Sequence, residues 1–322
     1  MSSTEAPAGG NQNRGPHLVG IFWAEAAVAS LVILLRISGR LMIRQLGLDD
    51  YMMVFTLLLF VILASFTTHL AIIGGCRHLF YLSPQQQLQA VKYNWISQPW
   101  GIFGFATGKI SVALLILRIM GPNTIWRKWI LYGCMASVLV INAIGSILTF
   151  VQCNPPRALW TPTIHAHCWN PKVQSDYAIF LSSWNVFIDV VLAMLPISIL
   201  WPLTLSLRKK ISLSVLLGLG LLAAICGSIK IKYLAGLTAR SDLTWETYNL
   251  YVWSASELFV IMTCGSIPPI KSLYDHFFGS KKHHRTGYTP YNDSDRSREL
   301  KFNSKVKETP RRLSEGVELE PL

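Results

Sequence analysis

An apolar stretch with a carboxylate near its middle constrains this chain more than any other feature. Residues 184–210 read WNVFIDVVLAMLPISILWPLTLSLRKK. The apolar part reaches the roughly 20 residues that a helix needs to cross about 30 Å of hydrocarbon. Asp189 is costly at that depth unless it faces the protein interior and finds a partner. The stretch therefore predicts a membrane helix inside a bundle, in which neighbouring helices tolerate Pro196 and the basic triplet 208–210 marks the cytoplasmic end.

The composition supports a membrane protein. Of the 322 residues, 51% are hydrophobic and only 14% are charged, whereas a soluble domain carries about 25% charged residues. The net charge of +12 lies in loops and the C-terminal tail, where it would favour anionic membrane lipid. No basic, aromatic-interleaved soluble domain is present, so nucleic acid is not expected as a partner. We expect no cleaved signal peptide, because the first membrane helix would act as its own signal.

Seven segments pass the test of length and apolarity. We therefore predict an all-α polytopic membrane protein with a bundle of seven transmembrane helices. The predicted spans are 18–38, 51–73, 95–120, 129–151, 177–205, 211–237 and 248–267.

Local signals mark some of the helix ends. Asp49 and Asp50 suit the first turn of the second helix, through capping and the macrodipole. Gly74-Gly75 ends that helix, and Ser83-Pro84 forms an N-cap with proline at the first helical position. The predicted organisation is a short extracellular tail, a seven-helix membrane domain, an amphipathic helix in the inner interface and a disordered cytoplasmic tail. Their ranges are 1–17, 18–270, 271–278 and 279–322.

The orientation follows from the lysines and arginines near the spans. The loops after the first, third and fifth spans carry nine, and the N-terminus with the other loops carries six. The tail adds eleven to the first side. We therefore place the N-terminus outside, the C-terminus in the cytoplasm and the chain in the plasma membrane.

The six cysteines divide into two groups of three. One group falls inside apolar segments and is expected to be buried: Cys134, Cys226 and Cys264. The other group lies on outer loops, at Cys76, Cys153 and Cys168. A disulfide between Cys153 and Cys168 would close a loop of about fifteen residues and contribute around 3 kcal/mol. This is the preferred pairing, although Cys76 can compete for either partner.

Ionisable residues inside the predicted spans have two interpretations. Each isolated charge at the bilayer centre costs about 2.5–3.5 kcal/mol, so we expect pairing, above all of Lys109 with Asp189 or Glu257. The group is either a ligand pocket or ion pathway between helices three, five, six and seven, or a structural lock with Lys230 and Lys232 snorkelling to the surface. The interior ionisable residues are Glu25, Lys109, Asp189, Lys230, Lys232 and Glu257. The candidate polar network or ligand pocket comprises Lys109, Asn185, Asp189, Lys230, Trp253 and Glu257.

Catalysis and cofactors have little support in the sequence. No HExxH, GxSxG or P-loop pattern occurs, and no His/Cys cluster has metal-ligand spacing. A retinal Schiff base would need a lysine deep in the bundle, and 248–270 contains none. We predict a protein that is not an enzyme and has no metal or cofactor. In the tail, the candidate phosphorylation sites are Ser314 within RRLS, and Thr289 and Thr309 before prolines.

Several motifs occur in order along the chain. They are GLDDY at 47–51, LSPQQ at 82–86, GKISVALLILRI at 108–119, QCNPPRALW at 152–160, NVFIDVVLAMLPISILWPL at 185–203, KIKYL at 230–234 and WSASE at 253–257. Together these motifs resemble those of the fungal rhodopsin-domain integral membrane proteins. The resemblance implies a seven-helix, receptor-like topology and supports Cys153–Cys168 as a pair, but supplies neither ligand nor reaction. Lys230 stands where the family usually shows arginine, which keeps the charge but loses a bidentate fork.

We therefore expect a receptor-like protein that senses a small molecule or a surface cue. The expected partners are membrane lipid, a small-molecule ligand and a cytoplasmic signalling partner. Two alternatives stay open: a transporter or auxiliary protein for secondary-metabolite (toxin) biosynthesis, and a membrane scaffold without a ligand.

Overall fold

Seven long helices account for nearly all of the described chain in this computed structural model. It describes residues 10–120, 125–161, 164–200, 207–236 and 243–278. The side chains of 119, 196–200, 207–217, 219, 235–236, 243 and 271–278 are outside the description. The described residues as far as 277 belong to the first of two units. The helices are α1 (Gly15–Met42), α2 (Leu48–Ile73), α3 (Pro84–Ile119), α4 (Ile125–Val151), α5 (Pro171–Leu200), α6 (Leu207–Gly236) and α7 (Leu243–Phe278).

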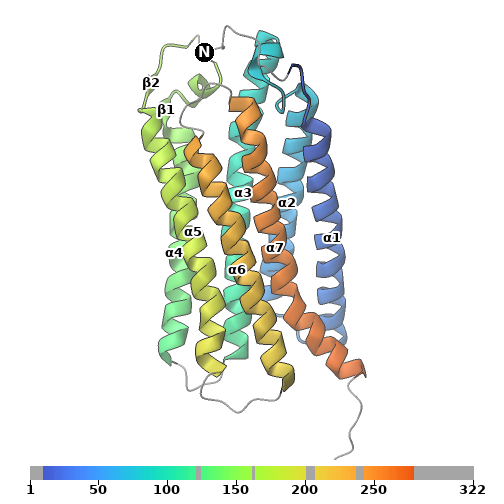
Figure 1. Ribbon diagram of the computed structural model, residues 1–322. Helices are drawn as coiled ribbons and strands as arrows, with labels where there is room; N and C mark the ends of the chain where they lie inside the picture. The colour runs from blue at the N-terminus through green and yellow to red at the C-terminus, as the bar shows by residue number, and fades with distance from the viewer. Residues whose placement is uncertain (1–9, 121–124, 162–163, 201–206, 237–242, 279–322) are drawn as a thin grey trace, which may run out of the picture. The chain divides into compact units, whose positions relative to one another are not determined.

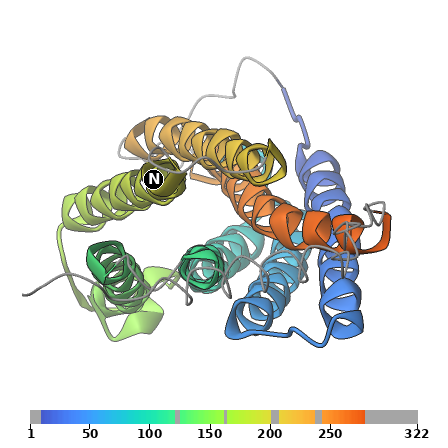
Figure 2. The same cartoon turned by 90° about the horizontal axis from the view of Figure 1, so that it is seen from below.

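Successive helices run in opposite directions within the first unit (Figure 1). Seen along the helices, α3 lies near the centre (Figure 2), and it packs against α2, α4 and α5. Within the described residues, each predicted span falls in one observed helix, except that the third span ends one residue after α3. Residues 201–205 of the fifth span and residue 237 of the sixth lie outside the described residues. The seventh span and the short helix expected after it form one continuous helix through Pro268 and Pro269.

The predicted helix-end signals act as expected. Gly74 ends α2 in the left-handed conformation, with φ of 101°. The Gln86 side chain accepts from the Ser83 amide at 3.0 Å, and Ser83 caps α3, which therefore begins eleven residues before the predicted span. Asp50 accepts a hydrogen bond from the Gly47 amide at 3.0 Å, so its capping role is confirmed.

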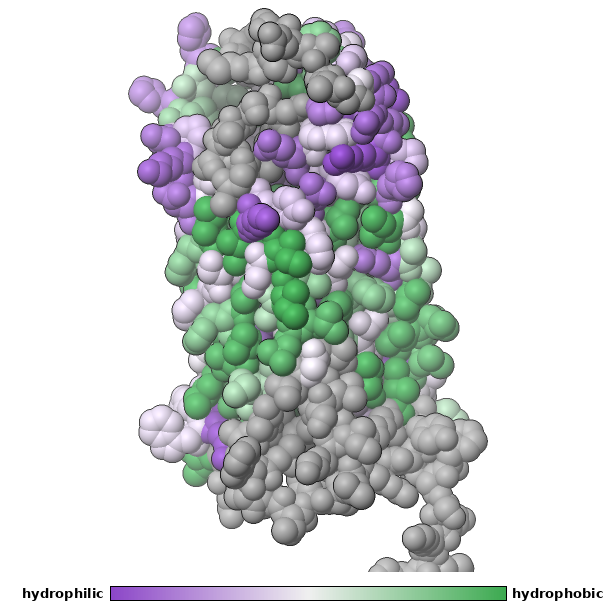
Figure 3. All heavy atoms as spheres, in the orientation of Figure 1, coloured by the Kyte–Doolittle hydropathy of each residue, from purple (hydrophilic) through white to green (hydrophobic). Residues whose placement is uncertain are grey.

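Six helices of the described part are long and apolar enough to cross a membrane, namely all except α6. The continuously described side chains of α6 run only from Gly220 to Leu234. An apolar band crosses the visible face, with hydrophilic residues above it (Figure 3). Trp126 and Trp129 at the start of α4 are 83% and 71% exposed, which is typical of side chains at a membrane–water interface. The crossing of the membrane by α6, which would make seven spans, and the orientation stay predictions.

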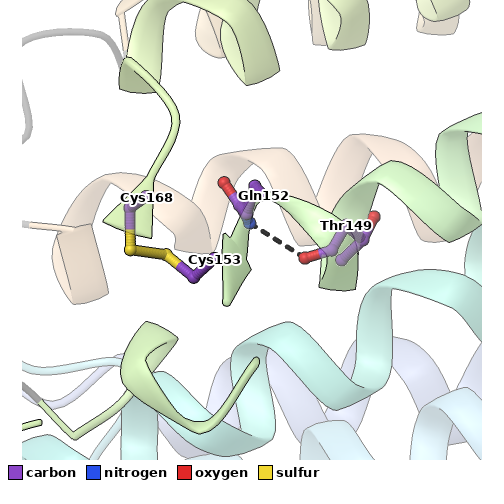
Figure 4. Close-up of a disulfide and its surroundings, with 4 residues drawn as sticks. All are labelled: Thr149, Gln152, Cys153 and Cys168. Carbon is purple, nitrogen blue, oxygen red and sulfur yellow. Dashed lines mark hydrogen bonds between the residues drawn. A yellow bond between two sulfur atoms is a disulfide. The ribbon is translucent and has the colours of Figure 1, made fainter. Parts of the chain in front are cut away.

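A disulfide closes the loop between α4 and α5. Two short strands, β1 (Cys153–Asn154) and β2 (His167–Cys168), pair antiparallel with the two cysteines opposite each other. The disulfide joins Cys153 to Cys168, as predicted, and lies close to Gln152, whose side chain donates to the Thr149 carbonyl at 2.9 Å (Figure 4). We call this the disulfide end of the bundle. Two 3₁₀ turns also lie in loops, η1 (Leu79–Tyr81) and η2 (Pro156–Leu159).

Cys76 does not compete for this pairing. It is a free thiol with 1% exposure, on the connection between α2 and α3. Burial raises the pKa of the Cys76 thiol to about 12. Because the thiolate is the species that attacks disulfides, the raised pKa and the burial of Cys76 both disfavour its attack on the disulfide.

The disulfide gives a first prediction. Cys168→Ala is expected to lower the free energy of unfolding by about 3 kcal/mol, because it opens a loop of 15 residues. Thermal unfolding of the purified protein in detergent measures the loss. Cys76→Ala is the matched control and should keep the disulfide in a non-reducing thiol-labelling assay. Loss of the disulfide in that variant would show that Cys76 shares in the pairing.

Candidate functional site

A buried ion pair joins α3 to α5 in the middle of the bundle. The Lys109 ammonium contacts the Asp189 carboxylate, and it also donates to the Asn185 backbone carbonyl at 3.1 Å. Glu257 Oε1 on α7 lies 4.0 Å from the same ammonium. The predicted contact of Lys109 with Asp189 is confirmed, and Glu257 is the second acid within reach.

A second ion pair joins α6 to α7. Lys230 Nζ lies 2.6 Å from Glu257 Oε2 and 4.1 Å from the centroid of the Phe105 ring. Lys230 is 6% exposed, so the one of the two interpretations in which it snorkels to the surface is wrong. Pairing with Glu257 and the aromatic face replaces its hydration. Lys232, two residues on, is exposed.

The two pairs share Glu257 and form one neutral group of two cations and two carboxylates. We call Lys109, Asp189, Lys230 and Glu257 the central ion network. It connects α3, α5, α6 and α7, the four helices that the sequence analysis singled out. Asp189 Oδ2 and Glu257 Oε1 have no hydrogen-bond partner among the described residues.

Gly227 allows α6 to reach this network. A Cβ at Gly227 would lie 2.6 Å from Val186 Cγ2 on α5 and 3.5 Å from Glu257 Cδ on α7. The first separation is too short for two carbons, so a larger residue would push the helices apart. Small residues commonly permit such close approach between membrane helices.

Asn185 extends the network toward α4. Its amide nitrogen donates to the Leu181 carbonyl at 2.9 Å and lies 3.3 Å from Asn142 Oδ1. Asn142 in turn donates its own amide nitrogen to the Val138 carbonyl at 2.7 Å, which fixes its oxygen as the acceptor. The orientation of Asn185 is thereby fixed, and its Oδ1 has no partner among the described residues.

Trp253 and Glu25 lie apart from the central ion network. Trp253 is half-buried, and no hydrogen bond or ion pair of the described residues joins it to the network. Glu25 on α1 accepts from Ser256 on α7 at 2.9 Å. Of the predicted network, the structure thus brings together Lys109, Asn185, Asp189, Lys230 and Glu257. Among the described residues, no group of three or more His, Cys, Asp or Glu side chains is placed to hold a metal ion.

Cavities lie on both sides of the central ion network. The upper cavity, toward the disulfide end, has a volume of about 130 Å³ and includes Asn94, Gln98, Asn185, Lys230 and Tyr251 in its wall. The lower cavity has a volume of about 40 Å³ and is lined by Lys109, Asp189 and apolar residues of α3, α5, α6 and α7. The ion network therefore separates two spaces along the helix axes.

A second buried charge cluster lies at the end opposite the disulfide, where the sequence analysis expected only helix caps. Arg36 on α1 donates Nη2 to Asp49 at 2.5 Å and Nε to Asp50 at 2.6 Å. Arg118 on α3 donates to the other oxygen of Asp49 at 3.3 Å. Arg40 lies further off, 3.7 Å from Asp49 and 4.0 Å from Asp50. We call these five residues the Arg36 cluster.

Arg36 also compensates for a proline in α7. In an unbroken helix the Gly265 carbonyl would accept from the amide of residue 269, but Pro269 has no N–H. Arg36 Nη1 donates to that carbonyl at 2.6 Å instead. One side chain of α1 thus binds two carboxylates of α2 and the backbone carbonyl of α7 that has no amide partner within its own helix. The sequence analysis missed this cluster, although two features together could have indicated it: the GLDD motif and an arginine inside the first apolar span.

Comparison with known proteins identifies the family. The fungal rhodopsin domain matches residues 35–276, which is most of the chain. The chain belongs to the fungal rhodopsin domain family. The match includes every residue of the central ion network and of the Arg36 cluster, and it leaves out residues 15–34 of α1. Both charge clusters therefore lie within the family domain.

Relatives of this fungal rhodopsin-domain protein carry different names. A "Fugralins biosynthesis cluster protein 2" of Gibberella zeae is 28% identical over 51% of this chain and 40% of its own length. A "Wortmanamides biosynthesis cluster protein C" of Talaromyces wortmannii is 23% identical over 78% of this chain and 69% of its own. "Receptor GIN3" of Arthrobotrys oligospora is 20% identical over 55% and 42%.

The chain thus spans about two fifths of the length of the first of these relatives. No solved structure matches it. The family and the six apolar helices together establish an integral, multi-pass membrane protein.

The central ion network gives a second prediction. Lys109→Met should lower the free energy of unfolding by about 3–5 kcal/mol, because Asp189 stays buried without its cation. Adding Asp189→Leu should recover much of this loss, because neither charge then remains. Thermal unfolding in detergent measures both, with the exposed Lys232→Met as the control. A loss no larger than that of Lys232→Met would show that the pair contributes little.

The Arg36 cluster gives a third prediction. Arg36→Leu should cost about 3–5 kcal/mol, because two carboxylates and one carbonyl lose their partner, whereas Arg40→Leu should cost less. In a Pro269→Ala background, the restored amide can bond Gly265, so the cost of Arg36→Leu should fall by about 1 kcal/mol. A double-mutant cycle of unfolding free energies measures this coupling. Strict additivity would contradict the role assigned to Arg36 in α7.

Proposed function

We propose that this protein is a receptor-like membrane protein, and not an enzyme, that senses a small molecule held in the upper cavity. The observation that carries the proposal is that Asn185 and Lys230 line that cavity and also belong to, or contact, the central ion network. A ligand there touches the groups that hold α3, α5, α6 and α7 together. The name of the relative GIN3 as a receptor agrees with this function.

The proposed signal is a change in helix packing around the central ion network. A ligand shifts such an equilibrium only by as much as it binds one state better than the other. The network has that capacity, because Lys109 lies within 4.0 Å of Glu257 while it contacts Asp189, so one cation has two alternative acids. In this proposal the protein lies in the plasma membrane, and a cytoplasmic signalling partner binds its inner loops and tail and responds to the change in packing. Ser314, Thr289 and Thr309 lie outside the described residues.

A second function has its own support. The lower cavity on the other side of the network resembles a space on a permeation path, and two relatives are named for biosynthesis clusters. A transporter or auxiliary protein for a secondary metabolite would use both cavities in turn. Uptake of a bound metabolite into proteoliposomes would favour this alternative, and binding without uptake would favour the sensor.

Ligand binding gives a fourth prediction, tested by thermal shift of the purified protein with metabolite extracts of its source organism. A ligand that binds only the folded state raises the apparent stability by RT ln(1 + [L]/Kd). Gly101→Leu should abolish the shift, because Gly101 lines the upper cavity and a Cβ there meets only Leu63, at 3.5 Å. Gly133→Leu is the matched control, since Gly133 is an exposed helical glycine with open space around it.

The outcomes separate the functions. A shift that both leucine variants retain would place the ligand outside the upper cavity. If no extract shifts the wild type and Asp189→Asn lowers only protein abundance, the protein is a scaffold and the sensor proposal is wrong.

A further inference from the structure

An arginine occupies a backbone position at the end of α1 that normally favours glycine. Arg44 has a φ of 54°, and it is the one non-glycine residue in the described part of the chain with a positive φ. Its amide donates to the Leu41 carbonyl at 3.0 Å, and the Gln45 amide donates to the Arg40 carbonyl at 2.9 Å. This pattern is a Schellman helix end, in which glycine avoids the steric cost that other residues incur. The strained backbone points to a function for the arginine side chain.

Two further arginines lie close to Arg44. Arg40 Nη1 donates to the Gln45 backbone carbonyl at 3.4 Å, and Arg118 Nη2 of α3 donates to the same oxygen at 2.7 Å. The side chains of Arg118 and Arg40 are 34% and 12% exposed, and Arg44, which directly precedes Gln45, is exposed. We call Arg40, Arg44 and Arg118 the Arg44 patch. It gathers positive charge from two helices and a loop at one accessible place.

The carboxylates of the Arg36 cluster do not neutralise this patch. That cluster contains three arginines and two aspartates, so it has one surplus cation among the described residues. Arg36 contacts both carboxylates most closely, whereas Arg40 comes no nearer to either than 3.7 Å. The exposed Arg44 adds a further positive charge. Because like charges at short range repel each other, an anion bound among them would be stabilising.

Exposed apolar side chains accompany the patch in the same short connection between α1 and α2. A surface that combines basic and apolar side chains suits the boundary between the headgroups and the acyl chains of a bilayer. On the predicted orientation, this end of the bundle meets the cytoplasmic leaflet, which contains anionic lipids. A soluble anion would leave the apolar side chains in water, so a lipid is the favoured occupant. These side chains are Leu41, Met42, Leu46 and Leu48.

We infer that the Arg44 patch binds the headgroup of an anionic phospholipid, with the phosphate against Arg44 and Arg118. Guanidinium groups bind phosphate oxygens through paired, charge-assisted hydrogen bonds. Arg40 contributes its charge from behind, and the exposed apolar side chains contact the acyl chains. A lipid bound in this way connects the end of α1 to α3.

Native mass spectrometry of the full-length protein in detergent tests the inference by titration. The lipid probes are dioleoyl phosphatidic acid and dioleoyl phosphatidylcholine, which has the same acyl chains but no net charge. Inorganic phosphate and a glutamate-rich peptide are the soluble anions. We expect phosphatidic acid to bind most tightly of the four.

Variants of single arginines locate the binding site. Arg44→Gly should weaken the binding of phosphatidic acid about fivefold, as the loss of one cation near an anionic lipid implies. Arg157→Gln is the matched control, because it removes an exposed arginine at the disulfide end, and it should keep the affinity. Since glycine suits the left-handed conformation, Arg44→Gly without added lipid should unfold at the wild-type temperature or above.

Several results would overturn the inference. Equal affinities of the wild type for the two lipids would do so, even if Arg44→Gly failed to fold. An unchanged affinity of Arg44→Gly for phosphatidic acid would place the lipid elsewhere. Inorganic phosphate or the peptide binding as tightly as phosphatidic acid would identify a soluble anion or an acidic protein as the occupant. A lower unfolding temperature of Arg44→Gly would show that the arginine serves the fold.

Discussion

A charge removed from water must be neutralised within the protein, and this constraint organises the centre of the bundle. Lys109, Asp189, Lys230 and Glu257 come from four helices, and none of them is more than slightly exposed. The rotation of each helix about its own axis is therefore restricted, because turning it would leave its charged side chain unpaired in hydrocarbon. Hydrophobicity alone does not provide this register, since lipid tails are as apolar as the helix faces.

The same constraint acts at the opposite end through the Arg36 cluster, with a different chemistry. Arginine presents a planar fork of donors, so Arg36 serves Asp49, Asp50 and the Gly265 carbonyl at once. The ammonium of Lys109 or Lys230 is a compact charge without such a fork. The Arg36 cluster thus connects α1, α2 and α7 through one side chain, whereas the central network needs two lysines to connect its four helices.

The sequence predicted well what depends on length and on electrostatic cost. Helix positions followed from the apolar segments, and the contact between Lys109 and Asp189 followed from the expense of leaving either unpaired. The predictions from the sequence were wrong or incomplete where the position of a side chain depends on tertiary packing. One of the two interpretations placed Lys230 at the surface, because its distance from the helix end allows snorkelling, but its ion pair with the buried Glu257 decides against that interpretation. Arg36 was not among the predicted interior charges, because nothing local shows that the carbonyl opposite Pro269 needs a donor.

The Gly265 contact has a mechanical consequence for α7. The stiffness of a helix normally comes from its own backbone hydrogen bonds, and Pro269 removes one of them. Arg36 of α1 supplies a hydrogen bond in its place, so the bending stiffness of α7 at this point depends on a neighbouring helix. Figure 1 shows α7 changing direction in this lower part. Any displacement of α1 along its axis would act there as a torque on the final turns of α7.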